Sequence, residues 1–318
     1  MPDFRIFIKT YPKDYRYLPH LFESLQLHNL DRIPITVCDD RTNLASLAEV
    51  LSPYHSSVTV IATEDVIADP FRSAEIDGSP EVGYMNQMLV KLAWGLTTQN
   101  FDYLCVDSDA KFIRDFRTED FYASNDLPFR YIEDDRPLYE QDQYWFEHGQ
   151  GREHALGRIC SFFEIRRQEL LLIHGFQVIR SEEVRGLDAY LQSRGHSLKS
   201  AVESFRNEFG LHAAYLTKVG SERCLQLSPF KIIHNQDHLV AQFLSCESEA
   251  SVSRSYLAVI YNSNFSRAWG EIGFESWKRF PTSTRYHNKL KKIFFRHWAN
   301  RFGPRRILRT INYLLRDP

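Results

Sequence analysis

Apolar and polar residues follow two different spacings along the first third of this chain. Short apolar runs, which are typical of buried strands, occur at 4–11, 33–40, 57–66 and 101–107. Segments whose apolar residues recur every three or four positions, as on one face of a helix, occur at 18–30, 44–54 and 83–96. Because strands alternate with helices, the pattern predicts a doubly wound α/β sheet.

The alternation ends near Phe116, and residues 117–160 are polar and aromatic without a clear period. The later pattern predicts a strand and a helix at 176–195, one long helix at 197–220, a strand at 229–235 and a helix at 241–262. The pattern gives no firm domain boundary before about residue 275. We therefore expect one domain over 1–275, with halves of about 1–116 and 117–275, followed by a separate segment at 276–318.

The composition is that of a globular protein. The 318 residues are 43% hydrophobic and 25% charged, and 14% are aromatic, an excess that fits either a core or stacking against bases and sugars. No stretch approaches the roughly 20 apolar residues of a membrane-spanning helix, and the N-terminus lacks the apolar segment of a secretory signal. Five scattered cysteines indicate a reducing compartment. We therefore expect a cytoplasmic protein.

Charge is unevenly distributed, with a basic segment at the C-terminus. Residues 278–318 hold twelve Lys and Arg and one acidic residue, whereas the rest of the chain has an acidic excess. Apolar residues recur at helical spacing on both sides of Gly303-Pro304, which predicts two short amphipathic helices. Such a basic helical tail is typical of binding to an anionic membrane surface, here through 278–316 on the inner face of the cytoplasmic membrane. Packing of the tail on the acidic body is the alternative, and no nucleic-acid partner is expected because no reader motif occurs.

Asp107 and Asp109 are the strongest chemical signal in the chain. They directly follow an apolar run, and the apolar residues Phe112 and Ile113 come after them. Two carboxylates one residue apart, at the carboxyl end of a buried strand, can bind one hard cation such as Mn²⁺ or Mg²⁺, which proteins commonly share with substrate phosphates. The pattern indicates a metal-dependent enzyme acting on a phosphorylated or nucleotide-linked substrate. A solvated turn at the strand end is the alternative.

Five segments, taken in order, resemble the nucleotide-sugar domain of GT-A type glycosyltransferases. The segments are KTYPKDY (9–15), GYMNQMLVKL (83–92), YLCVDSDAKFIRDF (103–116), NEFGLHAAYL (207–216) and FKIIHN (230–235). The likeness is to bacterial, DUF-class members that act in surface-polysaccharide biosynthesis. It implies a GT-A-like doubly wound mixed sheet with the donor site in the first half and the acceptor site in the second, and the basic amphipathic tail is then a C-terminal extension.

The resemblance implies donor-binding residues after each of the first two strands. Thr10, Tyr11 and Asp14 would lie near the nucleotide base or ribose, and the Tyr11 ring would stack on the base. Asp39 or Asp40 would accept hydrogen bonds from the ribose or base. The alternatives are an ordinary strand-end loop and a helix cap.

Gln87 and Lys91 lie four residues apart on a predicted helix, and therefore on one face of it. The resemblance directs this face to the donor, where Lys91 would meet the charge of the phosphates. A solvated helix face is the alternative.

The resemblance also implies a complete set of metal ligands. Asp107, Asp109 and His234 would hold the ion, with Asp109 the more direct ligand and Asp107 touching either the metal or the ribose. Imidazole is a good ligand for Mn²⁺ as well as Zn²⁺. A His234 that bonds to the backbone, or that belongs to a separate zinc site, is the alternative.

Glu208 corresponds to an acid that recurs before an aromatic residue in the resembling family. It is expected to act as the general base that takes a proton from the acceptor hydroxyl, which implies inversion, whereas a surface carboxylate is the alternative. The segment departs from the family pattern at Gly210, where a second acid is usual, and at His212, where an aromatic is usual. Residues 130–160 are rich in Tyr, Trp, Asp and Glu and are expected either to bind the acceptor or to form a mobile acidic loop.

Together these features predict a metal-dependent, hexosyltransferase-like enzyme. It would move a sugar from a nucleotide-diphosphate donor, with a UDP-sugar favoured, to a glycan or a lipid-linked saccharide. A protein of this fold that binds sugar nucleotides or membranes without turnover is one alternative, because the acid is missing at Gly210. A haloacid-dehalogenase-type phosphohydrolase is another, but there the Asp-x-Asp pair follows the first strand, and Thr or Val stands where this chain has Lys111.

Overall fold

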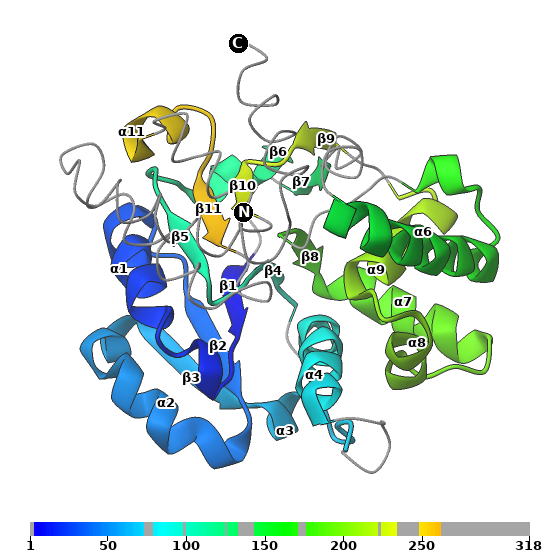
Figure 1. Ribbon diagram of the computed structural model, residues 1–318, viewed down its shortest axis with the longest axis horizontal. Helices are drawn as coiled ribbons and strands as arrows, with labels where there is room; N and C mark the ends of the chain where they lie inside the picture. The colour runs from blue at the N-terminus through cyan, green and yellow to red at the C-terminus, as the bar shows by residue number, and fades with distance from the viewer. Residues whose placement is uncertain are drawn as a thin grey trace, which may run out of the picture.

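A five-stranded mixed sheet forms the centre of the chain (Figure 1). The computed structural model describes residues 3–72, 79–97, 100–124, 126–132, 143–170, 176–221, 224–233 and 248–261. The strands of the sheet are β1 (Phe4–Lys9), β2 (Ile35–Asp39), β3 (Val58–Ala62), β4 (Asp102–Val106) and β8 (Val178–Arg180). They lie in the order β3-β2-β1-β4-β8. The first four are parallel and β8 runs antiparallel to β4, so the predicted mixed α/β sheet is confirmed.

Helices cover both faces of the sheet, as a doubly wound fold requires (Figure 1). One face packs against α1 (Leu18–His28) and α2 (Leu44–Leu51). The other packs against α4 (Ser79–Ala93), α6 (Gln143–Phe163), α7 (Ser181–Ser193), α8 (Leu198–Phe205) and α9 (Glu208–Lys218). The two-residue period of a strand produces this division: Ile6 and Ile8 belong to the first core, and Phe7 between them stacks on Trp94 in the second.

Two three-stranded sheets flank the central one. The first has the order β10-β11-β5, and the second has the order β6-β7-β9. Their bounds are β5 (Ala110–Phe112), β6 (Tyr122–Ser124), β7 (Leu127–Ile132), β9 (Cys224–Leu227), β10 (Phe230–Ile233) and β11 (Ala258–Tyr261). β11 pairs antiparallel with β5, so a strand from the end of the described chain lies beside the residues that follow Asp109.

Short helical segments join these elements. They are η1 (Pro12–Asp14), η2 (Arg41–Asn43), η3 (Ser52–Ser57), α3 (Thr63–Val66), η4 (Trp94–Leu96), η5 (Thr118–Phe121), η6 (Arg167–Glu169) and α11 (Glu249–Val252). The strand predicted at 57–66 therefore ends at Ala62, and its last four residues are helical. The predicted helix at 44–54 likewise ends at Leu51, just before Pro53.

The long helix predicted over 197–220 is wrong in one important respect, because two helices occupy this segment. α8 ends at Phe205, and Arg206 then takes a left-handed conformation with φ of 49°. Asn207 begins α9 by accepting a hydrogen bond from the Gly210 backbone N–H through its side chain. The apolar spacing runs through the break almost unchanged, so periodicity alone did not reveal it.

The segment at 143–160 is helical, so the alternative of a mobile acidic loop is wrong there. Leu156, Ile159, Cys160 and Phe163 of α6 are buried, at a spacing that places them on one helix face. Intrinsic propensity argues against this helix because three glycines occur in it. Packing of the apolar face against the other helices outweighs that propensity. Residues 133–142 of the expected acceptor segment lie outside the described residues.

The helix predicted over 241–262 is also wrong within the part that is described. Only Glu249–Val252 is helical, and Ala258–Tyr261 is a buried strand. A short continuous apolar run such as Leu257–Tyr261 fits a buried strand as well as a buried helix, and its pairing with β10 and β5 decides between them.

Several predictions fall on residues outside the described part of the chain. The boundary near residue 275, the basic tail at 276–318 and His234 are among them. The described cysteines Cys38, Cys105, Cys160 and Cys224 are free thiols, and the first three are buried. Within the described residues, no helix combines the length and the apolar character needed to cross a membrane.

Replacing Gly95 by alanine is expected to destabilise the protein by about 1–3 kcal/mol, the usual cost of overpacking a core. An added Cβ would lie 2.7 Å from Cγ2 of the fully buried Val184, which holds α7 against the sheet. Urea unfolding followed by circular dichroism measures the change. Gly83→Ala on α4 is the control, because no described atom lies within 4 Å of its added Cβ. The control is expected to stabilise the helix by about 0.5–1 kcal/mol, and equal effects in both variants would contradict the described packing.

Candidate functional site

The sheet has one point where the order of its strands reverses. The chain builds β1, β2 and β3 outward in one direction and then crosses back to place β4 on the other side of β1. In open α/β sheets, ligands bind at the carboxyl ends of the strands at such a switch point. Thr10 follows β1 and Ser108 follows β4, and the Ser108 hydroxyl donates to Oγ1 of Thr10 over 3.0 Å. The predicted site residues therefore gather at the edge where the fold itself favours a ligand.

Four of the predicted residues meet beyond the end of β4. Lys91 Nζ lies 2.8 Å from Asp107 Oδ1 and 3.6 Å from Glu208 Oε1. Gln87 Nε2 approaches the same Asp107 oxygen from one helical turn earlier in α4, at 3.5 Å. These residues come from a strand and two helices, and Glu208 is 101 positions beyond Asp107 in the chain. The structure thus brings together residues that the sequence had only placed in separate motifs.

The surroundings of Lys91 keep its ammonium charged. Its side chain is 7% exposed, and Nζ also lies over the Phe209 ring, 5.4 Å from the centroid. Burial by itself lowers the pKa of Lys91, but the carboxylates of Asp107 and Glu208 more than compensate, so its pKa is raised. The alternative of a solvated helix face is wrong for Lys91.

The same surroundings raise the pKa of Glu208, but for a different reason. It is buried, so the alternative of a surface carboxylate is wrong. Burial raises its pKa, and the more distant Lys91 only partly offsets this effect because that ammonium lies closer to Asp107. A carboxylate with a raised pKa is a stronger proton acceptor than an ordinary one, which suits a general base near neutral pH.

The start of α9 determines where Glu208 lies. Glu208 is the first residue of this helix, directly after the Asn207 cap. The cap lies over Gly210: an added Cβ there would be 2.8 Å from Cγ of Asn207. A side chain added at position 210 would therefore press on the Asn207 cap.

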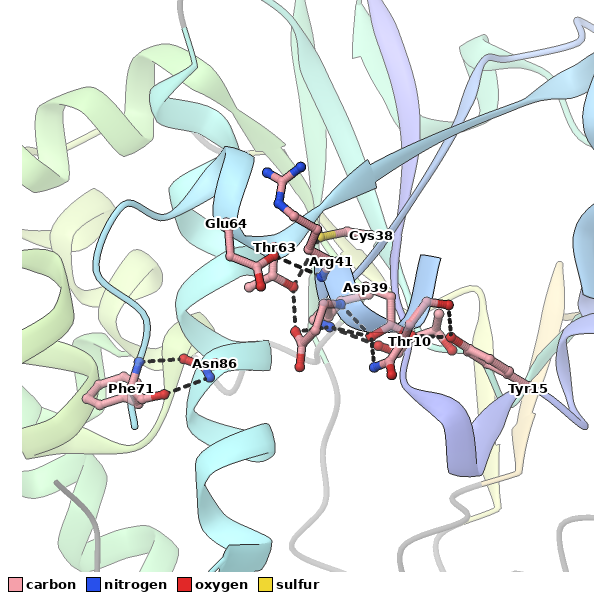
Figure 2. Close-up of polar contacts among 12 residues, drawn as sticks. Thr10, Tyr15, Cys38, Asp39, Arg41, Thr63, Glu64, Phe71 and Asn86 are labelled. Carbon is pink, nitrogen blue, oxygen red and sulfur yellow. Dashed lines mark hydrogen bonds and ion pairs between the residues drawn. The ribbon is translucent and has the colours of Figure 1, made fainter. Parts of the chain in front are cut away.

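A second cluster of charged residues lies beyond β1 and β2, around Asp39 (Figure 2). Asp39 Oδ2 accepts from the Tyr15 hydroxyl over 2.6 Å, and Oδ1 accepts from the Asp40 backbone N–H over 2.6 Å. The buried Lys9 ammonium lies 3.4 Å from a carboxylate oxygen of each aspartate and donates to the Thr10 carbonyl over 2.9 Å. Lys9 therefore joins the ends of the first two strands.

The two aspartates differ in how much of their carboxylate a ligand can reach. The Asp39 side chain is fully buried and both of its oxygens accept hydrogen bonds. The Asp40 side chain is 48% exposed, although Oδ1 accepts from the Thr63 hydroxyl over 2.8 Å. Asp40 is thus the more accessible of the pair. Asp39 instead holds Tyr15 and the Asp40 backbone in place through its hydrogen bonds. Neither side chain caps the helix that follows.

Sequence reasoning missed Lys9 and Tyr15 in this cluster. Lys9 could have been found, because it is a lysine at the end of an apolar strand. A lysine in that position needs an anionic partner at the sheet edge. In the parallel pairing Lys9 lies opposite Cys38, directly before the two aspartates. Tyr15 carried no signal in the sequence, because its partner Asp39 is 24 residues away.

The segment that leads into α4 is fixed by one side chain of that helix. Asn86 accepts from the Phe71 backbone N–H over 2.8 Å and donates to the Phe71 carbonyl over 3.1 Å (Figure 2). Asn86 directly precedes Gln87, so the contact also sets the rotation of α4 about its axis. Figure 2 shows a similar contact next to the second cluster, where the Arg41 backbone N–H donates to Glu64 over 2.9 Å.

Three further predicted residues, Tyr11, Asp14 and Asp109, lie along the same edge. Tyr11 and Asp14 belong to the turn after β1 and are half-buried. Asp109 is buried, and its carbonyl accepts from the Tyr261 backbone N–H over 3.0 Å. Burial raises the pKa of Tyr17, and both Asp14 and Asp109 add to this through their charge, so both act on the same hydroxyl.

Of the three predicted metal ligands, the described residues include Asp107 and Asp109. No group of three or more His, Cys, Asp and Glu side chains that could hold an ion occurs among them, and His234 lies outside them. Asp107 and Asp109 are the carboxylates at the end of β4, and the Asp107 side chain is 36% exposed. One or two carboxylates, completed by water and by substrate phosphate oxygens, are the usual protein contribution to a Mg²⁺ site. The donor set therefore fits a hard cation.

Comparison with known proteins adds weak structural likenesses, two of which are described here. No protein-family model and no curated protein sequence matches the chain. It is similar to the apo structure of the bifunctional glycosyltransferase WbbM, with 11% identity, a TM-score of 0.46 and coverage of 92% of this chain and 51% of that one. It is also similar to apo mouse xyloside xylosyltransferase 1, with 10% identity, a TM-score of 0.43 and coverage of 82% and 98%. The chain spans about half the length of WbbM, and likenesses at this level do not assign it an activity.

Glu208→Gln is expected to change how stability depends on pH. The pKa of Glu208 is raised above its ordinary value of 4.5. At a pH between these two pKa values, Glu208 is protonated in the folded state but has lost its proton in the unfolded state. The wild type therefore loses stability as the pH rises from about 4.5 through the folded-state pKa, and Glu208→Gln does not show this loss. Urea midpoints measured between pH 4 and 8 test this. Glu203→Gln, which removes an exposed carboxylate of α8, is expected to behave like the wild type.

Gly210→Ala is expected to destabilise the protein by about 1 kcal/mol, the usual value of a side-chain cap, because it displaces Asn207. Asn207→Ala removes the same hydrogen bond and is expected to cost a similar amount. If both act through the cap, the double variant costs little more than either single one. Fully additive losses in urea unfolding would show that Gly210 matters for another reason.

Proposed function

We propose that this protein is a metal-dependent glycosyltransferase that moves a sugar from a nucleotide-diphosphate donor to an acceptor hydroxyl. The observation that carries the proposal is the meeting of Gln87, Lys91, Asp107 and Glu208 at the switch point of the sheet. It combines, in one place, a cation suited to phosphate, a carboxylate suited to a metal and a buried carboxylate suited to proton transfer.

The charge at this edge supports a bound cation. The two clusters and Asp109 contribute seven charged side chains: Lys9, Asp39, Asp40, Lys91, Asp107, Asp109 and Glu208. Five of these seven are acidic and two are basic, so this set has an acidic excess although the proposed ligand is anionic. A diphosphate entering this field needs further positive charge close to it. Asp107 and Asp109 are the residues that would hold the metal, which supplies that charge and neutralises the leaving diphosphate when bound.

The residues of the two clusters would contact different parts of the donor. Lys91 and Gln87 would contact the diphosphate, since both already converge on the Asp107 oxygen. Thr10, Tyr11, Asp14 and Asp40 would bind the nucleoside, with Asp40 the accessible acid of its pair. Asp39 would act indirectly, through its bonds to Tyr15 and Lys9.

Glu208 would act as the general base. The acceptor oxygen attacks the anomeric carbon, the bond from that carbon to the diphosphate oxygen breaks, and the bonding electrons leave with the diphosphate. The acceptor proton passes to the Glu208 carboxylate, whose raised pKa makes it a better proton acceptor than an ordinary carboxylate. Because a base of this kind activates the acceptor for direct displacement, we propose inversion at the anomeric carbon.

The substrates are proposed by class. A UDP-sugar is the favoured donor, and a glycan or a lipid-linked saccharide is the acceptor. A lipid-linked acceptor would agree with a peripheral position on the inner face of the cytoplasmic membrane, which we propose for the basic residues at 278–316.

A thermal-shift series with Mn²⁺ and a set of nucleoside diphosphates tests the proposal. One nucleotide, with UDP favoured, is expected to stabilise the wild type by about 2.7 kcal/mol at a hundredfold excess over its dissociation constant. Asp109→Asn is expected to lose the metal-dependent part of this shift. Asp126→Asn, which changes an exposed carboxylate away from the site, keeps it.

Turnover is measured on the same proteins, as hydrolysis of the sugar nucleotide in the absence of acceptor and as sugar transfer in its presence. Glu208→Gln is expected to keep nucleotide binding and to lose turnover by about 10²- to 10⁴-fold, the usual contribution of a general base. Nucleotide binding without any turnover in the wild type would favour a non-catalytic binding protein. No shift with any nucleotide would contradict the proposed donor site.

A further inference from the structure

A third, buried group of polar and charged side chains lies beside the site, formed by Arg130 of β7, Glu183 of α7 and His212 of α9. The guanidinium of Arg130 pairs with Glu183 Oε1 and donates to the Val178 carbonyl over 2.6 Å. His212 Nε2 lies 3.0 Å from Glu183 Oε2. All three residues are at most 8% exposed. The catalytic proposal uses none of them.

Glu183 is held as a carboxylate at the centre of this cluster. Burial raises its pKa, but Arg130 and His212 more than compensate, and its pKa is lowered. The Arg180 backbone N–H also donates to Oε2 over 3.3 Å. Glu183 therefore offers His212 a fixed anionic partner, and that partner is tied to the central sheet through Val178 and Arg180, both in β8.

Helix α9 connects this cluster to the candidate site. Glu208 and His212 are four residues apart, which places them on the same face of the helix, one turn apart. At the first turn, Glu208 reaches Lys91 on α4, and at the second, His212 reaches Glu183 on α7. The Asn207 cap restrains the first turn of this helix from one side. The contact of His212 one turn further on adds a second restraint on where the Glu208 carboxylate can lie.

We propose that Arg130, Glu183 and His212 are positioning residues, which hold α9 so that Glu208 stays in reach of Lys91 and of the acceptor. Buried ion pairs of this kind add little stability compared with apolar residues of similar volume. Their directional contacts instead fix one arrangement of the elements they join. The proposal rests on the proposed function, in which Glu208 is the base.

His212→Phe is the main test, because phenylalanine fills the volume and removes the bond to Glu183. Turnover is expected to fall about 10- to 100-fold, the effect of displacing a reacting group by about 1 Å, while the KM for the donor stays unchanged. His212→Gln, which restores a hydrogen-bond donor toward Glu183, is expected to recover most of the turnover. His196→Phe is the matched control, since this half-buried histidine packs on Phe162 away from the site. Unchanged turnover in His212→Phe, or a rise in KM alone, would overturn the proposal.

Amide hydrogen exchange of residues 208–212 provides a readout that does not need activity. His212→Phe and Glu183→Gln are expected to accelerate exchange there at least tenfold relative to α7, and His212→Gln to restore it. If the wild type transfers no sugar, the proposed function fails, and the exchange data still decide whether the cluster holds α9. If His212→Phe does not fold, Glu183→Gln supplies the same comparison. Exchange that is equal in the wild type and Glu183→Gln would overturn the proposal.

Discussion

A lysine ammonium that is buried from water needs anions around it, and the site is arranged to supply two of them to Lys91. Removing an ion from water costs several kcal/mol, which only close partners can offset. Asp107 and Glu208 meet this requirement at 2.8 Å and 3.6 Å. Satisfying one charge therefore fixes three elements relative to each other: α4, the end of β4 and the start of α9.

The fold places the cluster around Lys91 beside the cluster around Lys9. The reversal of strand order puts the ends of β1 and β4 next to each other, and the hydroxyls of Thr10 and Ser108 join them. A buried lysine is present on each side, Lys9 with the aspartates after β2 and Lys91 with the carboxylates around β4. Each lysine keeps the carboxylates next to it in place, so ion pairs join the ends of β1 and β2 and also join α4 to the end of β4.

Glu208 shows how local conformation decides where a side chain lies. In a continuous helix from 197 to 220, Glu208 would be a residue in the middle of a helix. The left-handed Arg206 and the Asn207 cap instead make it the first residue of a new helix, where its carboxylate turns toward Lys91. The same break explains Gly210, because the cap occupies the space that a side chain would need.

The alternation of strand and helix up to Val106, and the placement of Asp107 at a strand end, were determined by the sequence itself, because two-residue and four-residue apolar periods are local properties. The same reasoning placed Gln87 and Lys91 on one helix face. The sequence did not determine the helix at 143–163, the break at Arg206 or the strand at 258–261, since packing partners distant in the chain decide each of them. Nor did the sequence show that Lys9 pairs with Asp39 or that His212 contacts Glu183. Those pairings depend on which strand ends and helix faces become neighbours, and only the tertiary structure decides that, because a buried charge is satisfied by whatever the fold brings within a few ångströms of it.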